Sequence, residues 1–391
     1  MEEMSRRDFV KTTAVVAGVA ALGGVPGVLR AMTKTAVAVV QSDMDLGGAC
    51  KFDMSVWGDD TAKSKQKLGL MEMTWTPESM AEVEKMLRSA IKLTGGLPVK
   101  KGDTVIIKPN VVQTPHLGFF LLANYSAARA LATISDPRVV IAAAKIAREQ
   151  GAKTVIIAES NASNCHSFFQ ESGYETGVAA LKDPAVKLLY LDGTSYKMMK
   201  PKKAALALPQ YAIFDAVEKA DTMISVAPMK THMWAGTTMT MKNFVGLPAN
   251  KVYGSYKSGL PHSNIADVIV DLTSIAKERI KSHYGIVTGI YAGEGLGPLQ
   301  VDAKALNTIV AGPDYVAVDA VGSTIMGFDA AAIGHIRKAY EKGLGNMKGI
   351  EVVGTPIEKV QFAAKPIPEA ARQKGGENNS WDSMVGRKLP V

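Results

Sequence analysis

Residues 230–246 hold the densest group of chemically active side chains in the sequence. The segment brings an ammonium group at Lys230 and an imidazole at His232 close to a second ammonium group at Lys242. Neighbouring lysines lower one another's pKa, and an ammonium group beside a bound carboxylate or phosphate stabilises that anion. An imidazole can give or take a proton near neutral pH. We therefore predict that Lys230 and Lys242 neutralise an anionic ligand and that His232 is the catalytic acid or base.

Other polar side chains stand directly after predicted buried strands, as Lys108 and Asn110 do after the β-branched run 104–107. The carboxyl ends of parallel strands meet at one edge of a sheet, where ligands of α/β proteins bind. We expect a site there, with Glu294 and Asp314 orienting cations or hydroxyl groups. The alternative for each lysine taken alone is a solvated surface charge. The candidate ligand-binding residues are Lys108, Asn110, Thr237, Asn243, Lys251, His262, Glu294 and Asp314.

The segments around these residues alternate between short apolar runs and helix patterns. Thr76 and Pro77 are typical of a helix start and Gly95 of its end, and a second helix is predicted from Asp136 to Gly151. Strands that are apolar on both faces and alternate with helices indicate a parallel sheet. The sequence therefore predicts an α/β fold, a mainly parallel sheet with helices on both faces.

Composition divides the chain into three parts. Residues 1–32 form a predicted signal peptide, residues 33–360 the α/β domain, and residues 361–391 an irregular C-terminal tail rich in Pro, Gly, Lys and Asn. Within the domain, residues 43–70 are polar and aperiodic, which predicts a long N-terminal excursion over the surface.

The first residues have the layout of a twin-arginine export signal. Arg6 and Arg7 precede the uncharged apolar run 14–29, so we expect export through the twin-arginine translocase, to the periplasm or otherwise out of the cytoplasm. A run of ~16 residues rich in Gly and Ala is shorter than the ~20 strongly apolar residues that a membrane span needs. We therefore expect no stable transmembrane span after processing.

The chain is basic, and its charge is not concentrated. The formal net charge is +8, but no long run of Lys and Arg interleaved with aromatic residues is present, so nucleic-acid binding is not indicated. A basic balance in an exported protein fits an acidic ligand or an anionic membrane surface, and it also contributes to solubility.

Motifs for metals and cofactors are sparse. Cys50 and Cys165 allow one disulfide or two free thiols, and they are too few for an iron–sulfur cluster from this chain alone. His232 and His262 are candidate metal ligands or proton-transfer groups, but they lack the spacing of a metal motif, so the metal and any cofactor stay unassigned. Methionines in the same region suit either copper binding or core packing; they are Met229, Met233, Met239 and Met241.

The order of these motifs resembles the family called domain of unknown function 362. The resemblance rests on a Gly-Asp-x-Val-x-Ile-Lys-Pro-Asn stretch at 102–110, a Lys-x-His…Thr…Lys-Asn-x-x-Gly block at 230–246 and a Gly-x-Gly-Pro loop at 295–298, and it extends over residues 35–355. The chain departs from the pattern at Thr288, where the family often has Asp, and it lacks the ferredoxin-like cysteine motifs of many members. The resemblance implies the fold and a site among these residues, and it leaves the reaction open.

Two functions fit these features. The first is an exported soluble enzyme of redox or proton-transfer type that binds an anionic small molecule, with or without a metal. The second is a non-catalytic accessory protein that binds a metal or cofactor for a periplasmic redox complex. Both functions use the same charged residues, so the sequence does not separate them.

Overall fold

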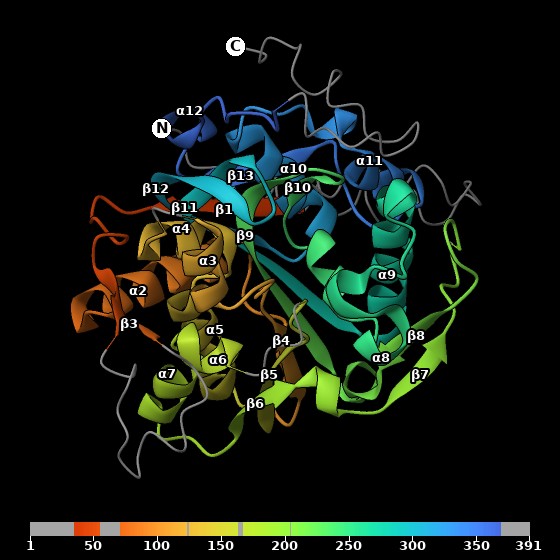
Figure 1. The fold of residues 1–391 in the computed structure, drawn as a ribbon, viewed down its shortest axis with the longest axis horizontal. Helices are drawn as coiled ribbons and strands as arrows, with labels where there is room; N and C mark the ends of the chain where they lie inside the picture. Colours follow the sequence, from red (N-terminus) through yellow and green to blue (C-terminus); the bar gives the residue numbers. More distant parts are fainter. Residues whose placement is uncertain (1–34, 55–70, 123–124, 163–166, 204, 369–391) are drawn as a thin grey trace, which may run out of the picture. The chain divides into compact units, whose positions relative to one another are not determined.

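A large, mainly parallel sheet carries the site (Figure 1). The computed structural model describes residues 35–54, 71–122, 125–162, 167–203 and 205–368. The strands of the large sheet are β1 (Thr35–Gln41), β4 (Thr104–Lys108), β5 (Thr154–Glu159), β6 (Val186–Tyr190), β9 (Thr222–His232), β10 (Gly236–Thr238), β11 (Ser282–Leu296), β12 (Gln300–Gly312) and β13 (Ile350–Gly354). Their order is β13-β1-β12-β11-β9-β4-β5-β6, and β10 pairs with β9. Two small sheets join β2 (Cys50–Asp53) to β3 (Glu72–Trp75) and β7 (Tyr196–Met199) to β8 (Tyr211–Phe214).

Helices connect most of these strands. The α-helices are α2 (Pro77–Leu93), α3 (Pro115–Leu121), α4 (Ala127–Thr133), α5 (Pro137–Glu149), α6 (Phe168–Glu171), α7 (Tyr174–Ala180), α8 (Asn250–Tyr253), α9 (Ile265–Arg279), α10 (Tyr315–Ile325), α11 (Gly334–Glu341) and α12 (Ile357–Val360). Short 3-10 helices are η3 (Leu191–Gly193), η4 (Asp215–Lys219), η5 (Lys242–Gly246), η6 (Ser255–Lys257), η7 (His262–Asn264) and η8 (Ala330–Ala332). Across the described ranges, none of the helices is both long and apolar enough to cross a bilayer.

The side chains of β4 show why helices cover both faces of the sheet. Val105 and Ile107 belong to a hydrophobic cluster with residues of α2 and α5, whereas Ile106 belongs to a second cluster with residues of α9 and α10. Successive side chains of a strand point to opposite faces, so the two clusters lie on the two faces. In Figure 1, α2 and α5 lie on one side of the sheet and α9 on the other. The predicted α/β fold with helices on both faces is confirmed.

The two helix starts that the sequence predicts are capped as expected. Thr76 accepts a hydrogen bond from the backbone N–H of Ser79 at 3.2 Å and begins α2. Asp136 accepts one from the backbone N–H of Arg138 at 3.0 Å and begins α5. A side-chain acceptor at this position satisfies a backbone donor that has no partner within the helix. These caps fix where α2 and α5 begin beside the sheet.

Strand β12 is antiparallel to both of its neighbours, β1 and β11, which the apolar pattern did not predict. It forms an antiparallel hairpin with β11, with Leu296 opposite Gln300, and it is also antiparallel to β1. The carboxyl end of β12 therefore lies at the edge of the sheet opposite to the carboxyl ends of β4, β5 and β9. Asp314 follows β12, so the expectation that it lies with the other strand-end residues is wrong.

The segments predicted as irregular are partly ordered and packed. Within the N-terminal excursion, β2 pairs with β3, which follows the excursion, and Cys50 is buried. Residues 361–368 form no helix or strand, yet Ile367 is fully buried. The signal peptide 1–32, most of the tail and Cys165 lie outside the described residues, so the division of the chain at residues 32 and 360 stays a prediction.

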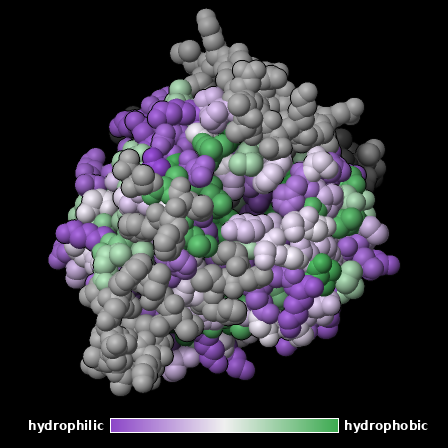
Figure 2. All heavy atoms as spheres, viewed as in Figure 1, coloured by the Kyte–Doolittle hydropathy of each residue, from purple (hydrophilic) through white to green (hydrophobic). Residues whose placement is uncertain are grey.

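On the face of the molecule that Figure 2 shows, hydrophilic residues are interspersed with small groups of hydrophobic ones. The exposed large hydrophobic residues come from separate elements, for example Leu93 in α2 and Met198 in β7. Single apolar residues of this kind are normal on a protein surface and mark no binding face by themselves.

We predict that Asp314 is a helix cap. Its Oδ1 accepts the backbone N–H of Val316 at 2.9 Å, and its Oδ2 accepts that of Asn346 at 2.8 Å. Asp314→Ala should lower the free energy of unfolding by ~1–2 kcal/mol, as loss of a cap does, while Asp314→Asn keeps an acceptor and should lose less. Urea denaturation of the three proteins measures this. Equal stability of the Ala variant and the wild type would contradict the assignment.

Candidate functional site

A cavity of 740 Å³ lies where β4, β5 and β9 end. The last residue of each strand lines it: Lys108, Glu159 and His232. The basic lining side chains are Lys108, Lys242, Lys257, His232 and His262. Apolar residues form much of the remaining wall, among them Met233, Trp234, Val245, Leu296 and Leu299. The carboxyl edge of the parallel strands thus holds a cavity that is both basic and apolar, as expected for a ligand site in this fold class.

Lys108 is fixed in the wall by a buried ion pair. Its ammonium group donates to Glu159 Oε1 at 2.5 Å, to Pro109 O at 2.7 Å and to Asn243 Oδ1 at 3.3 Å. Burial lowers the pKa of Lys108 and raises that of Glu159, and the attraction between the two charges opposes both shifts. Gly246 leaves room for the pair, because a methyl group there would lie 2.8 Å from Lys108 Nζ.

Asn243 joins two neighbouring strands behind the wall. Its Nδ2 donates to Lys108 O at 2.7 Å and to Val226 O at 3.1 Å, and its Oδ1 accepts from Asn110 Nδ2 at 3.2 Å. Asn243 is buried and does not line the cavity, whereas Asn110 does. We infer that Asn243 positions the wall and that Asn110 is the amide available to a ligand.

Lys230 is held by backbone carbonyl groups and does not line the cavity. Its ammonium group donates to Thr133 O at 2.5 Å and to Pro298 O at 3.0 Å, which ties the end of α4 to the turn between β11 and β12. Burial, and then the charge of Lys242, lower its pKa well below the usual value. These contacts make Lys230 a positioning residue for the loops around the site.

Within the described ranges, Lys242 differs from the other lysines of the site because its ammonium group has no partner. Lys242 lines the cavity, and in the described part of the chain no hydrogen bond or ion pair engages its Nζ. Burial, and then the charge of Lys108, lower the pKa of Lys242 to about 8. The turn that presents it is held by the buried carboxylate of Asp319, which accepts the backbone N–H of Thr240 at 2.8 Å and that of Met241 at 3.0 Å. Asp319 therefore fixes the backbone next to Lys242, and the ammonium group of Lys242 is available to a ligand.

His232 lines the cavity as expected for a strand-end histidine. Its Nδ1 accepts the backbone N–H groups of Trp234 and Ala235, each at 3.3 Å. Burial, and then the charges of Lys242 and Lys230, lower its pKa well below the usual value, so the ring is neutral at pH 7. A neutral ring that accepts at Nδ1 carries its proton on Nε2, and it is a hydrogen-bond donor at that nitrogen.

His262 has the opposite tautomer. Its Nδ1 lies 2.9 Å from the carbonyl oxygen of Leu260, an acceptor, so Nδ1 carries the proton and Nε2 has the lone pair. Burial lowers its pKa, the bond to Leu260 opposes this, and the charge of Lys242 adds to it. The ring of Trp234 packs edge-on against that of His262, with centroids 5.2 Å apart. The cavity therefore holds one imidazole donor and one imidazole acceptor.

Lys257 is a cavity residue that the sequence analysis missed. Its ammonium group donates to Ser160 Oγ at 2.9 Å and to the carbonyl of Pro248, and burial lowers its pKa to about 8. Tyr256 and Lys257 have φ angles of 56° and 53°, in the left-handed region that residues with a side chain rarely adopt. Glycines at both ends of residues 254–259 signal a turn, but no motif indicates that the turn returns a lysine to the cavity.

Besides Asn243, four predicted ligand-binding residues lie away from the cavity lining. Thr237 is fully buried in β10 and Lys251 is exposed on α8. Glu294 accepts the backbone N–H of Lys365 at 2.9 Å and pairs with its ammonium group at 3.3 Å, while Asp314 caps α10. The predicted residues that do line the cavity are Lys108, Asn110, His232, Lys242 and His262.

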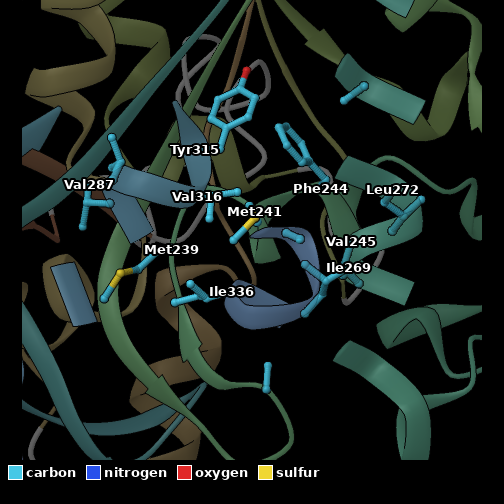
Figure 3. Close-up of a cluster of buried hydrophobic side chains, with 14 of the residues drawn as sticks. Met239, Met241, Phe244, Val245, Ile269, Leu272, Val287, Tyr315, Val316 and Ile336 are labelled. Carbon is cyan, nitrogen blue, oxygen red and sulfur yellow. The ribbon is translucent and has the colours of Figure 1, made fainter. Parts of the chain in front are cut away.

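The methionines near the site mainly fill the core. Met239 and Met241 are fully buried and lie among hydrophobic side chains that include Val287 and Ile336 (Figure 3). Met233, in contrast, lines the cavity. Among the described residues, no group of three or more His, Cys, Asp or Glu side chains is placed to hold a metal ion. The core-packing alternative therefore accounts for Met239 and Met241.

Comparison with known proteins gives two matches to families and one relative. The model described as domain of unknown function DUF362 matches residues 105–324, more than half of the chain. The model of the twin-arginine translocation pathway signal sequence matches residues 3–23. A thylakoid-associated protein of Synechocystis sp. is 26% identical over 255 residues, which cover 63% of this chain and 71% of that protein.

The pKa of Lys242 predicts how stability depends on pH. In the folded protein it is about 8, against an ordinary value of 10.5, so between these values the unfolded chain binds more protons and stability rises with pH. Below pH 8 both states are protonated, and the folded state carries the cost of the partly buried charge. Lys242→Met should therefore stabilise the protein at pH 7 by on the order of 1 kcal/mol, an advantage that shrinks as the pH approaches 10.5.

Urea denaturation at several pH values between 7 and 10 measures this difference between Lys242→Met and the wild type. The exposed Lys251 provides the matched control, because Lys251→Met removes a lysine that is surrounded by solvent. A stability difference for Lys242→Met that stays constant over this range would show that Lys242 titrates like a surface lysine.

Proposed function

Because this chain belongs to the DUF362 family and carries a twin-arginine export signal, we propose that it is an exported protein whose cavity binds an anionic small molecule. One observation carries the proposal: Lys242 lines the cavity, and its ammonium group has no partner in the described part of the chain. Lys242 is partly buried, and a charge withdrawn from water without a partner is costly. A bound carboxylate, sulfonate or phosphate would supply the missing counter-charge.

The balance of charge in the cavity supports an anion over a cation. Glu159 neutralises Lys108, and the low pKa values of His232 and His262 leave both rings neutral at pH 7. Lys242 and Lys257 are then in excess, with Asp192 nearby through Ser160 as a partial counter-charge. The net positive potential in a partly apolar cavity attracts and stabilises an anion.

The walls also indicate the kind of anion. Trp234, Leu296 and Leu299 offer apolar surface beside the basic groups, and a volume of 740 Å³ can accept a molecule larger than an inorganic ion. The ligand we propose therefore has an anionic group and an apolar or aromatic body.

The two histidines suggest separate roles in place of a single acid or base at His232. His232 would donate its Nε2–H to the ligand, and His262 would accept a proton at Nε2. This pair suits proton transfer on a bound anion. Binding is common to an enzyme and to an accessory protein, so it is the property to test first.

The fluorescent aromatic sulfonate anilinonaphthalene sulfonate is a suitable probe, because it combines an anionic group with an apolar body. We expect one equivalent to bind to the wild type in a fluorescence titration. Lys242→Met should weaken binding by about ten- to a hundredfold, since a hydrogen bond to a charged group contributes ~1.5–3 kcal/mol.

Lys251→Met is the control for this titration, because Lys251 is exposed and does not line the cavity. It should bind the probe like the wild type, and higher salt should weaken binding in both. If Lys242→Met and Lys251→Met bound the probe equally well, the cavity would not be the anion site.

The signal sequence generates a separate prediction for localisation to the periplasm. Replacing Arg6 and Arg7 by Lys should leave an unprocessed precursor in the cytoplasm, because the arginine pair defines this signal class. Fractionation of the native host, with immunodetection of the precursor and mature forms, measures the outcome. Normal export of the double variant would contradict the route.

A further inference from the structure

We propose that Lys242 is a reactive amine that forms a Schiff base with an aldehyde or ketone bearing an anionic group. This deepens the proposed function and rests on it, because the carbonyl compound occupies the same cavity.

The first support is that the other lysines of the site are engaged. Glu159 holds Lys108, two backbone carbonyl groups hold Lys230, and Ser160 with Pro248 hold Lys257. An amine that forms a Schiff base must give up such bonds and present its lone pair. Among the lysines around the cavity, Lys242 alone has an Nζ without a partner in the described part of the chain.

The second support is the surroundings of Lys242. Apolar groups such as Val245 line the same cavity, and the charged Lys108 is near enough to disfavour a second ammonium ion. Burial and a neighbouring cation are the two factors that make a lysine nucleophilic near neutral pH. With a pKa of about 8, about a tenth of Lys242 is neutral at pH 7, whereas an ordinary lysine is almost wholly protonated.

The third support is a set of groups for the proton transfers. The neutral amine attacks the carbonyl carbon, a C–N bond forms, and the C–O bond then breaks with release of water that takes both amine protons. His262 can accept a proton from the amine at Nε2 and return it to the departing oxygen, while the Nε2–H of His232 donates a hydrogen bond to that oxygen. The step consumes no oxidant or reductant.

The remaining charge explains why the carbonyl compound should be anionic. Lys257 uses two of its three N–H donors on Ser160 and Pro248, which leaves one for a ligand. A carboxylate or phosphate on the substrate would pair with this ammonium group while Lys242 reacts with the carbonyl carbon. A neutral aldehyde lacks that contact.

Reductive trapping tests the proposal on the wild-type protein. The protein is incubated at pH 8 with sodium cyanoborohydride and either glyoxylate or acetaldehyde, which differ by a carboxylate in place of a methyl group. Peptide mapping by mass spectrometry then gives the adduct at Lys242 relative to that at exposed Lys251 in the same sample. Using this ratio removes the difference in intrinsic reactivity between the two aldehydes.

We expect Lys242 to be the main site of the glyoxylate adduct, and its ratio to Lys251 to exceed that for acetaldehyde by about tenfold or more. Trapping on surface lysines only, in protein that still binds anilinonaphthalene sulfonate through Lys242, would overturn the Schiff base and leave the proposed function standing. The same ratio for both aldehydes would overturn the anionic substrate class. Lys242→Arg, verified as folded by circular dichroism, should lose the adduct at position 242 and keep the surface adducts.

Discussion

The buried ion pair between Lys108 and Glu159 is the interaction on which the site depends. It joins the ends of two adjacent parallel strands, and Asn243 connects it to a third. A buried pair of this kind adds little net stability, but loss of one partner leaves an uncompensated charge and costs ~3–5 kcal/mol. It therefore fixes the geometry of the cavity wall. Because Gly246 is packed against it, η5 and Lys242, which begins this short helix, are placed relative to the same pair.

The contrast among the site lysines shows how one residue type serves different purposes. Lys108 and Lys230 donate hydrogen bonds to protein groups and so connect segments that are distant in sequence. Lys257 is partly engaged, and Lys242 is free in the described part of the chain. Burial lowers the pKa of all four lysines. They differ in the hydrogen-bond partners of their ammonium groups and in whether they line the cavity. Charge density in the sequence, which singles out residues 230–246, does not distinguish a lysine that connects parts of the structure from one that binds a ligand.

Sequence reasoning found the edge of the sheet and part of the site, for identifiable reasons. The apolar runs before Lys108 and Glu159 mark buried parallel strands, and their carboxyl ends do meet at the cavity. The same reasoning failed for Asp314 because an apolar run carries no direction, and β12 turns back in a hairpin. It missed Lys257 because the left-handed turn at Tyr256 depends on tertiary contacts. The tautomers of His232 and His262 depend on backbone groups that no sequence pattern specifies.

An unpaired ammonium group also links ligand binding to the stability of the fold. Without a ligand, the folded protein carries the cost of desolvating Lys242, which has no counter-charge among the described residues. An anion that binds the folded state supplies that charge, so the cost is offset only in the complex, and the complex is stabilised by mass action. Filling the position with a carboxylate from the chain would stabilise the empty protein and remove the attraction for a ligand. Lys108 is paired with Glu159, and this pair fixes the structure of the site. Lys242 has no such partner in the described chain, which leaves its charge available to bind a ligand.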